Sequence, residues 1–238
     1  MKATNNVNML KEIYHVVTAF VWKQKRKLRS LVLMAFSRES IFNHYYRANK
    51  WGALESKSGE GSCIDETEEV REYIVKIIET CSVKTILDAP CGDFNWMRMV
   101  NLDGVRYTGA DIVKELISSN SNNYSQNNIS FVILDICKDS LPNNDLMLCR
   151  DALVHFSNKD IISFLNNIKN SKIKYLLTTT FPETERNIDI STGMWRPINL
   201  CGFPFNLPQP ILILNEKFPG KNGRYKDKSL ALWEVDKI

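Results

Sequence analysis

Three aspartates stand at the ends of short apolar runs that have the pattern of buried β-strands. They are Asp88, Asp111 and Asp135. Because parallel strands present their carboxyl ends at one edge of a sheet, these side chains are expected to share one cleft. Carboxylates in such a cleft accept hydrogen bonds from hydroxyl and amino groups, so the sequence predicts a site for a polar ligand.

The turn after Asp88 contains the first candidate ligand contacts. It reads Ala89-Pro-Cys-Gly-Asp93, and a glycine in this place lets the backbone approach a ligand closely. We predict that Asp88, Ala89, Pro90 and Gly92 contact the ligand. A helix is expected to begin near Asp93.

The spacing of the other two acids indicates which ligand groups they would meet. Asp111 lies about 20 residues beyond the first turn, where an acidic residue binds the two hydroxyls of a ribose. Asp135 follows the next strand, where it can accept from the amino group of adenine while Ile136 covers the ring. With Ile112 beside the ribose position, the pattern predicts an adenosine-containing ligand.

Five strand-like runs alternate with helical ones, which is typical of βαβ units that build a parallel sheet. The runs are Thr85–Leu87, Tyr107–Ala110, Ile129–Leu134, Asp145–Cys149 and Lys174–Thr180. Ser157, followed by Asp160, is expected to cap the helix between the last two.

The end of the chain breaks this alternation. Ile211–Leu214 and Ser229–Val235 both resemble strands, and the turn-forming segment Pro219–Gly223 lies between them without a helix. These two runs therefore predict an antiparallel hairpin.

The first 62 residues have a different character. Apolar residues recur at helical spacing from Leu10 to Phe36 around the basic run Lys23–Arg29, which predicts an amphipathic helix or helix pair. Arg47–Ser62 lacks an apolar period and predicts a loop, either a plain connector or a cradle over the ligand. Asp65 is expected to cap the next helix. We divide the chain into a helical extension with its loop, residues 1–62, and an α/β domain, residues 63–238.

Composition excludes several classes of protein. The 238 residues are 44% hydrophobic and 24% charged, as in an ordinary globular domain, and no uninterrupted apolar run is long enough for a membrane-spanning helix. The 6 cysteines show no CxxC pair and no nearby histidine cluster, so we expect neither a metal site nor a disulfide framework. A cytoplasmic location fits best.

Three motifs resemble those of class I S-adenosylmethionine-dependent methyltransferases. Leu87–Asp93 is similar to their glycine-rich loop, Gly109–Asp111 to the ribose-binding acid and Leu134–Ile136 to the adenine-binding acid. The resemblance runs from about Asp65 to the C-terminus, although Pro90 and Phe94 replace the usual glycines. It implies a Rossmann-like α/β fold, a mostly parallel seven-stranded sheet with a C-terminal antiparallel hairpin, and S-adenosyl-L-methionine as cofactor.

A dinucleotide fold for NAD or FAD is the rival interpretation of the same loop. It needs G-x-G-x-x-G, of which only Gly92 is present, and Asp93 would repel a pyrophosphate. The amino and sulfonium groups of the methyl donor are compatible with nearby carboxylates.

In the resembled family, the segment after the fourth strand, here Cys149–His155, lies beside the methyl group. Arg150 is then expected near the amino acid end of the cofactor. Methyl transfer is a direct displacement in which alignment supplies most of the acceleration, and a hydroxyl acceptor would use a base. Asp151 and His155, four positions apart on a predicted helical turn, are the candidates.

The segment Phe181–Pro210 is rich in proline, glycine and aromatic residues and is long for a connector, so it is a candidate active-site cover. Within it, Trp195 and Arg196 are candidates for acceptor binding. An equally good interpretation is that Trp195 packs the cover and Arg196 holds it through an internal ion pair.

These patterns favour O-methylation of a small molecule or glycan. The motifs of DNA and RNA amino methyltransferases, Pro-Pro-aromatic after the fourth strand, are absent, as is the Pro-Cys of cysteine-dependent pyrimidine enzymes. An RNA methyltransferase that uses the basic run Lys23–Arg29 is the alternative in the same fold. A third hypothesis is a non-catalytic protein whose N-terminal helix makes peripheral contact with a membrane or a partner, with the α/β domain as scaffold.

Overall fold

The computed structural model describes residues 2–217 and 225–238, and these residues form a 7-stranded sheet in the order β3-β2-β1-β4-β5-β7-β6. The strands are β1 (Thr85–Asp88), β2 (Arg106–Asp111), β3 (Ile129–Ile133), β4 (Leu146–Cys149), β5 (Tyr175–Thr180), β6 (Leu212–Asn215) and β7 (Ser229–Glu234). β1 to β5 pair in parallel, while β7 is antiparallel to both β5 and β6. The predicted α/β class and C-terminal antiparallel pair are therefore confirmed.

Alternating side chains of the strands bury two separate faces of the sheet. On one face Leu87, Met147 and Leu176 pack against helix α5 (Asn158–Lys169). On the other, Ile86, Leu146 and Leu177 pack against α3 (Glu68–Thr80) and α4 (Lys114–Tyr124). A central parallel sheet covered on both faces needs such continuous apolar runs.

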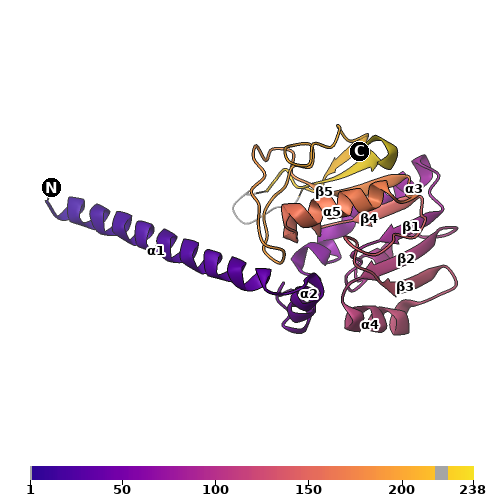
Figure 1. Cartoon of the computed structure of the whole chain (residues 1–238), viewed down its shortest axis with the longest axis horizontal. Helices are drawn as coiled ribbons and strands as arrows, with labels where there is room; N and C mark the ends of the chain where they lie inside the picture. The colour runs from indigo at the N-terminus through magenta and orange to yellow at the C-terminus, as the bar shows by residue number, and fades with distance from the viewer. Residues whose placement is uncertain (1, 218–224) are drawn as a thin grey trace.

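The N-terminal extension consists of two helices, α1 (Lys2–Met34) and α2 (Arg38–Arg47). Figure 1 shows α1 projecting away from the α/β body, whereas α2 lies against it. Ser37 caps α2, since its hydroxyl accepts from the backbone N–H of Ser40 at 3.1 Å. Within the described residues, no helix is long and apolar enough to cross a membrane.

The other helix caps were predicted with mixed success. Ser157 caps α5 as expected and accepts from Asp160 N at 3.1 Å. Asp65 does not cap α3, because it opens a 3-10 turn, Asp65–Thr67, that precedes this helix. The remaining 3-10 turns among the described residues are Glu60–Ser62, Met97–Met99, Leu153–His155 and Val235–Lys237.

The helix predicted to begin near Asp93 does not form. Phe94 adopts a left-handed backbone conformation, with φ +59°, which interrupts a right-handed helix at its first turn. Only the 3-10 turn Met97–Met99 follows. The predicted hairpin turn Pro219–Gly223 lies wholly within residues 218–224, which are outside the described residues.

Candidate active site

A cleft of about 620 Å³ opens at the carboxyl ends of the parallel strands. It is lined by most of the predicted site residues, namely Asp88, Pro90, Gly92, Asp111, Ile112, Asp135, Ile136, Arg150, Asp151, His155 and Trp195. α2, the loop 51–62 and the segment 181–210 supply further walls. The volume is within the range of small-molecule sites. Ala89 is an exception to the prediction, because it packs in the core under α5 and does not line the cleft.

Asp88, at the end of β1, is a buried carboxylate. Its Oδ2 accepts from the hydroxyl of Tyr107 at 2.6 Å. Burial raises the pKa of Asp88 to about 7, and the nearby charge of Asp111 raises it as well. The Tyr107 hydrogen bond and the charge of Arg150 lower it, but by less. A positively charged or hydrogen-bond-donating group in the cleft would therefore stabilise the charged form of this carboxylate.

Asp111, at the end of β2, is also buried. Its Oδ1 accepts from the backbone N–H of Val113 at 3.0 Å. Burial raises the pKa of Asp111 to about 6, although backbone N–H groups of Val113, Gly92 and Ile112 counteract the effect. No ion pair joins Asp88 or Asp111 to a cation in the part of the chain that the structure describes. The ends of β1 and β2 thus bring together two carboxylates that can accept hydrogen bonds from a ligand.

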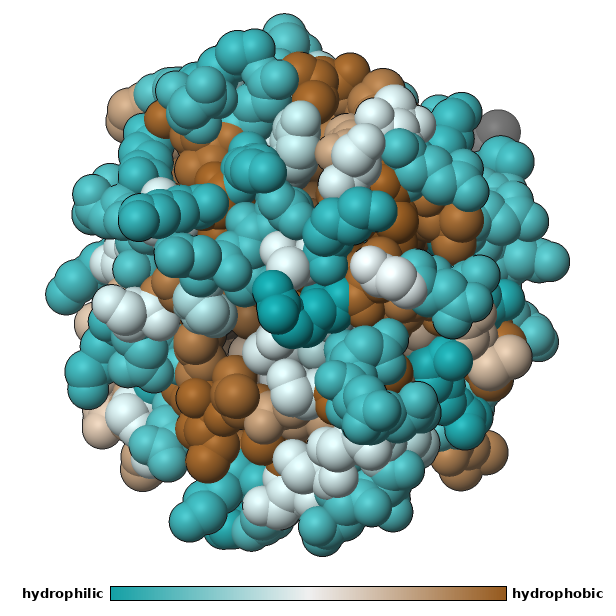
Figure 2. All heavy atoms as spheres, turned by 90° about the vertical axis from the view of Figure 1, so that its right-hand side faces the viewer, coloured by the Kyte–Doolittle hydropathy of each residue, from teal (hydrophilic) through white to brown (hydrophobic). Residues whose placement is uncertain are grey.

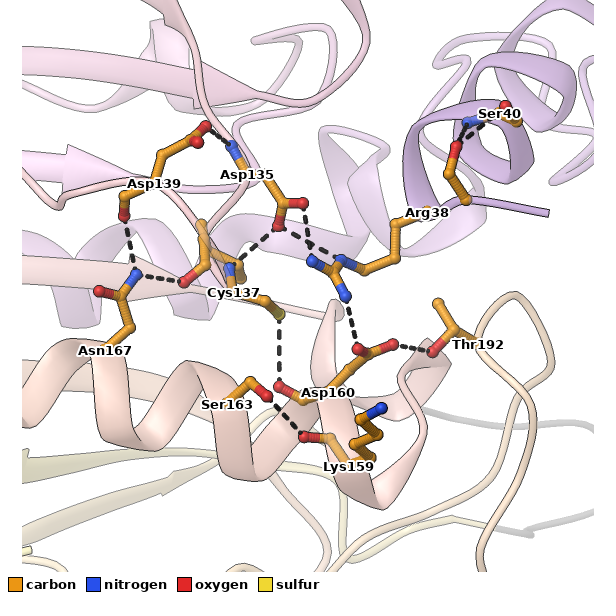
Figure 3. Close-up of polar contacts among 12 residues, drawn as sticks. Arg38, Ser40, Asp135, Cys137, Asp139, Lys159, Asp160, Ser163, Asn167 and Thr192 are labelled. Carbon is orange, nitrogen blue, oxygen red and sulfur yellow. Dashed lines mark hydrogen bonds and ion pairs between the residues drawn. The ribbon is translucent and has the colours of Figure 1, made fainter. Parts of the chain in front are cut away.

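Asp135, which follows β3, is already bound by a cation. Figure 3 shows Arg38 of α2 directed at its carboxylate, with Nε 3.3 Å from Oδ1 and Nη2 2.8 Å from Oδ2. The backbone N–H of Cys137 also donates to Oδ1, at 3.0 Å. A carboxylate offers about four acceptor positions, so Asp135 retains capacity for a further donor. Arg38 lines the cleft beside it.

The same guanidinium reaches a second acid. Arg38 Nη1 lies 2.5 Å from Oδ1 of Asp160 on α5, and Asp160 Oδ2 accepts from the hydroxyl of Thr192 at 2.5 Å. Figure 3 shows Arg38 of α2 together with Asp135 after β3, Asp160 of α5 and Thr192 of the segment 181–210. The N-terminal extension, the sheet edge and the segment 181–210 are therefore joined through one arginine. No pattern in the sequence pointed to Arg38 as a residue of the site.

The loop 51–62 is fixed to the turn after β1. Asp93 Oδ2 accepts from the Ser56 hydroxyl at 2.9 Å and from Lys57 N at 2.8 Å, while Asp93 N donates to Ser58 Oγ at 3.0 Å. Gly92 has φ +56°, and a Cβ there would lie 2.3 Å from Ser58 Oγ. Only glycine fits this contact. Of the two interpretations left open for this loop, the contacts favour the cradle, because Lys57 to Ser62 line the cleft.

Arg150 lies at the base of the cleft within a buried charge cluster. It donates from Nη2 to Glu216 Oε2 at 2.7 Å and from Nη1 to Gly61 O at 2.7 Å, and its guanidinium lies over Trp96. Lys228 Nζ is 3.1 Å from the same Glu216 oxygen. Arg150 lines the cleft. Its Nε is buried and has no hydrogen-bond partner among the described residues.

Asp151 is held as a carboxylate by two cations. Lys228 Nζ lies 2.6 Å and Arg150 Nη1 3.4 Å from Asp151 Oδ2. Burial alone would raise its pKa, but the charges of Lys228 and Arg150 outweigh burial and hold the pKa of Asp151 well below its usual range. A carboxylate stabilised in this way is a weak base. The two ion pairs therefore do not favour Asp151 as a base. Its φ of +54° also removes it from the predicted helical turn with His155.

His155 has the properties that a base requires. Its Nδ1 lies 3.0 Å from the carbonyl oxygen of Met194. A carbonyl can only accept, so Nδ1 carries the proton and Nε2 has a lone pair. Burial lowers the pKa of His155, and the opposing effects of the Met194 hydrogen bond and the Asp151 charge are smaller.

Aromatic side chains form the wall around His155. Trp51 lies against the histidine ring at 6.1 Å between centroids, and Trp195 meets Tyr225 at 4.6 Å and Phe181 at 6.1 Å. All of them line the cleft. Trp195 is 38% exposed, so its indole is accessible to a molecule in the cleft.

Arg196, the neighbour of Trp195, points away from the cleft. Its donors reach the carbonyl oxygens of Leu153 and Ile188 and the side-chain oxygen of Asn158. The side chain is buried and does not line the cleft. The prediction of acceptor binding is therefore corrected: Arg196 holds the segment 181–210 in place, through backbone carbonyls rather than an ion pair.

Sequence reasoning missed several lining residues besides Arg38. Trp96, Tyr225 and Lys228 line the cleft, and Tyr225 and Lys228 come from a distant segment that has no spacing relation to the strand-end acids. Lys228 also contacts Glu216, which does not line the cleft. Glu216 and Lys228 flank the hairpin strands β6 and β7, and a pair of opposite charges beside two apolar strands was the only available signal.

Comparison with known proteins supports the fold. No protein-family model matches the chain, and no curated protein matches it in sequence. The N-methyltransferase NodS from Bradyrhizobium japonicum WM9, in complex with S-adenosyl-L-homocysteine, aligns over 80% of this chain and 97% of that chain with a TM-score of 0.56 and 12% identity. PigF with S-adenosyl-L-homocysteine aligns over 71% and 55%, with a TM-score of 0.52 and 14% identity.

Other matches are partial. Human N-acetylserotonin methyltransferase, in complex with S-adenosylmethionine, aligns with 47% of this chain and only 33% of that chain, at 19% identity and a TM-score of 0.39. This chain thus spans about a third of that protein. The strand order, the antiparallel pair and the agreement with NodS and PigF together show that the chain has the Rossmann-like methyltransferase fold.

Proposed function

We propose that this protein is an S-adenosylmethionine-dependent methyltransferase that methylates a hydroxyl group of a small molecule or glycan. The observation that carries the proposal is that Asp88, Asp111 and Asp135, from three neighbouring strands, line one cleft. Acids at successive strand ends match the amino, ribose and adenine groups of that cofactor in order.

The residues present fit the cofactor by their chemistry. Asp88 and Asp111 are buried carboxylates without an ion-pair partner among the described residues, and their raised pKa values reflect the energetic cost of that state. Hydroxyl and ammonium donors would relieve this cost. Arg150 Nε, buried and unpartnered at the cleft, would meet a carboxylate at the amino acid end.

Each residue then has a defined role in holding the cofactor. Asp111 would accept from the ribose hydroxyls, Asp88 would face the amino acid portion, and Asp135 with Ile136 would border the adenine. Pro90, Gly92 and Ile112 would supply the close walls. Bound there, S-adenosylmethionine supplies a methyl group on a positively charged sulfur, ready for transfer to a nucleophile.

His155 would prepare the acceptor. Its Nε2 lone pair faces no hydrogen-bond donor among the described residues, and the Met194 carbonyl fixes the ring in the tautomer that leaves this lone pair available. Nε2 would take the hydroxyl proton as the oxygen becomes a nucleophile. Trp51, beside the ring, helps to exclude water.

The aromatic wall of Trp51, Phe181, Trp195 and Tyr225 favours a flat or sugar-like acceptor. Indole faces pack against the apolar face of a sugar ring or against another aromatic ring. Asp151, fixed as a carboxylate by Lys228, would accept a hydrogen bond from an acceptor hydroxyl without removing its proton. It is thus a binding residue rather than a base.

The test is methyl transfer itself. The full chain is incubated with S-adenosylmethionine and, in parallel, with monosaccharides, phenols, amines and a short RNA, and each product is analysed by mass spectrometry. We expect a mass gain of one methylene group on a hydroxyl acceptor, reduced at least tenfold in Trp195→Ala. Transfer to the amines or RNA alone would contradict the proposed acceptor, and failure to bind S-adenosylhomocysteine would contradict the proposed enzyme class.

A further inference from the structure

Helix α1 contacts the body through a polar and small-residue face. Arg29 Nη2 donates to Tyr45 Oη at 2.9 Å, and the hydroxyl oxygens of Ser30 and Ser191 are 2.6 Å apart. Arg26, Ser30 and Leu33 are the half-buried residues in this part of the helix. At 100° per residue these positions share one side of α1.

The opposite side of α1 carries an apolar stripe that the described residues leave uncovered. It consists of Val17, Phe20, Val21, Leu28, Leu31 and Val32, which are each between 44% and 64% exposed. These positions are separated by three, four or seven residues, which places them on one face. A helix normally buries such a face against its own domain. The apolar stripe instead points away from the body, which indicates that something else covers it.

The side of the α/β body that faces away from α1 is mostly hydrophilic. Figure 2 shows that hydrophilic residues cover most of that face, with apolar residues visible between them. Figure 1 shows that α1 extends well beyond the body. The apolar stripe is therefore a distinct surface.

Its charge identifies the kind of partner. Every charged residue between positions 14 and 36 is basic, namely Lys23, Lys25, Arg26, Lys27 and Arg29. On the helical wheel, Lys25 and Lys27 lie at the two edges of the apolar stripe. Long basic side chains at these edges let the apolar face enter a lipid surface while their ammonium groups stay at the headgroups.

We propose that the apolar stripe of α1 binds an anionic lipid surface, with the helix lying in the plane of the interface. A second copy of the chain fits less well, because pairing two stripes would place Lys25 and Lys27 beside their equivalents with no acidic residue between positions 14 and 36 to compensate. Lipid phosphates and carboxylates supply the missing negative charge.

This surface is linked to the cleft. α1 leads into α2, whose Arg38 and Phe42 line the cleft, and Ser30 contacts Ser191 in the segment that carries Trp195. The helix proposed to bind lipid is therefore connected to two of the segments that form the cleft. The inference rests on α1 alone and does not depend on the proposed methyl transfer.

Sedimentation of the full chain with vesicles tests the inference. One set of vesicles contains equal amounts of phosphatidylcholine and phosphatidylserine, and the other contains phosphatidylcholine alone. We expect binding to the first set that falls at least tenfold in the second and weakens with added salt. Leu28→Gln combined with Leu31→Gln, and separately Lys25→Glu combined with Lys27→Glu, should each reduce binding at least tenfold.

Matched controls separate the stripe from general surface effects. Ile162→Gln changes an exposed apolar residue of α5, and Lys169→Glu changes a basic one, and neither should alter vesicle binding. Equal binding to both sets of vesicles, or no binding at all, would overturn the inference. So would a stable dimer in sedimentation velocity that the Leu28 and Leu31 changes dissociate, or RNA binding that the Lys25 and Lys27 changes abolish.

Discussion

Arg38 Nη2 lies 2.8 Å from Asp135 Oδ2, so the acid that follows β3 is held by a helix that precedes the whole α/β domain in the sequence. The arginine is 22% exposed and its two acidic partners less so. Shielded, charge-assisted hydrogen bonds of this kind are stronger than surface pairs. Cofactor contacts at Asp135 therefore depend on where α2 lies.

Arg38→Ala should lower the free energy of unfolding by about 1 to 3 kcal/mol, because Asp135 and Asp160 lose their shared cation. Urea unfolding followed by circular dichroism measures the change. The matched control is Arg47→Ala in the same helix, which breaks the exposed pair with Glu115 of α4 and should cost much less than Arg38→Ala. Equal losses in the two variants would show that the Arg38 contacts contribute no more to stability than the exposed Arg47 pair.

Glu216→Gln should be more damaging to stability. It leaves Arg150 and Lys228 near one another without their shared buried carboxylate, and disruption of a buried pair costs about 3 to 5 kcal/mol. Thermal and urea unfolding both measure this loss. Glu69→Gln, which removes the exposed partner of Lys217, is the control and should change stability far less than Glu216→Gln. If Glu216→Gln is as stable as wild type, water must solvate Arg150 and Lys228 in place of the carboxylate.

His155→Gln should separate catalysis from cofactor binding. Loss of the base predicts a rate reduction of about 100-fold to 10,000-fold for a hydroxyl acceptor, while the affinity for S-adenosylhomocysteine stays the same. The wild-type rate should be constant above pH 7 and fall in acid, because burial lowers the pKa of His155 from its ordinary value. Steady-state kinetics across pH tests both points, with His44→Gln on the surface of α2 as the control. A variant with full activity would remove His155 from the mechanism.

The buried Asp88 should make the cofactor-free protein less stable as pH rises. Its pKa is raised to about 7 in the folded state, so between its ordinary value and 7 the folded protein binds more protons than the unfolded chain. The stability that comes from this proton uptake is therefore fully present below the ordinary pKa of the carboxyl and is lost progressively as pH rises from there to about 7.

Asp88→Asn removes that dependence and keeps an acceptor for the Tyr107 hydroxyl. Relative to wild type, it should gain on the order of 1 to 3 kcal/mol of stability between about pH 5 and pH 8. Urea unfolding at a series of pH values in the cofactor-free protein measures the difference. Parallel curves for the two proteins would show that Asp88 titrates at its ordinary pKa.

Local sequence patterns were sufficient to predict the sheet and the strand-end acids. The strands that end at Asp88 and Asp111 are short and bounded by polar residues, and the neighbouring run Leu146–Cys149 is apolar throughout because both faces of a parallel sheet are buried. Ser157 could be recognised as a cap because capping depends on residues within one turn. The order of the acids then followed from the geometry of parallel strands.

The electrostatic partners of the site were not accessible to the same reasoning. Arg38 meets Asp135, and Lys228 meets Asp151, only after segments far apart in the sequence fold together. The role of Asp151 changed from base to fixed carboxylate for this reason. The helix expected near Asp93 failed because Ser56, Lys57 and Ser58 bind the Asp93 side chain and backbone, another contact between distant segments.

Calorimetric titration of S-adenosylhomocysteine into wild type and Asp111→Ala tests the central claim most directly. Asp111 is the buried acid assigned to the ribose, and no side chain among the described residues shares its carboxylate. We predict that wild type binds and that the variant, with its fold intact by circular dichroism, loses about 1 to 3 kcal/mol of binding free energy. Equal binding by the two proteins, or no binding by either, would contradict the assignment of this cleft to an adenosine-containing methyl donor.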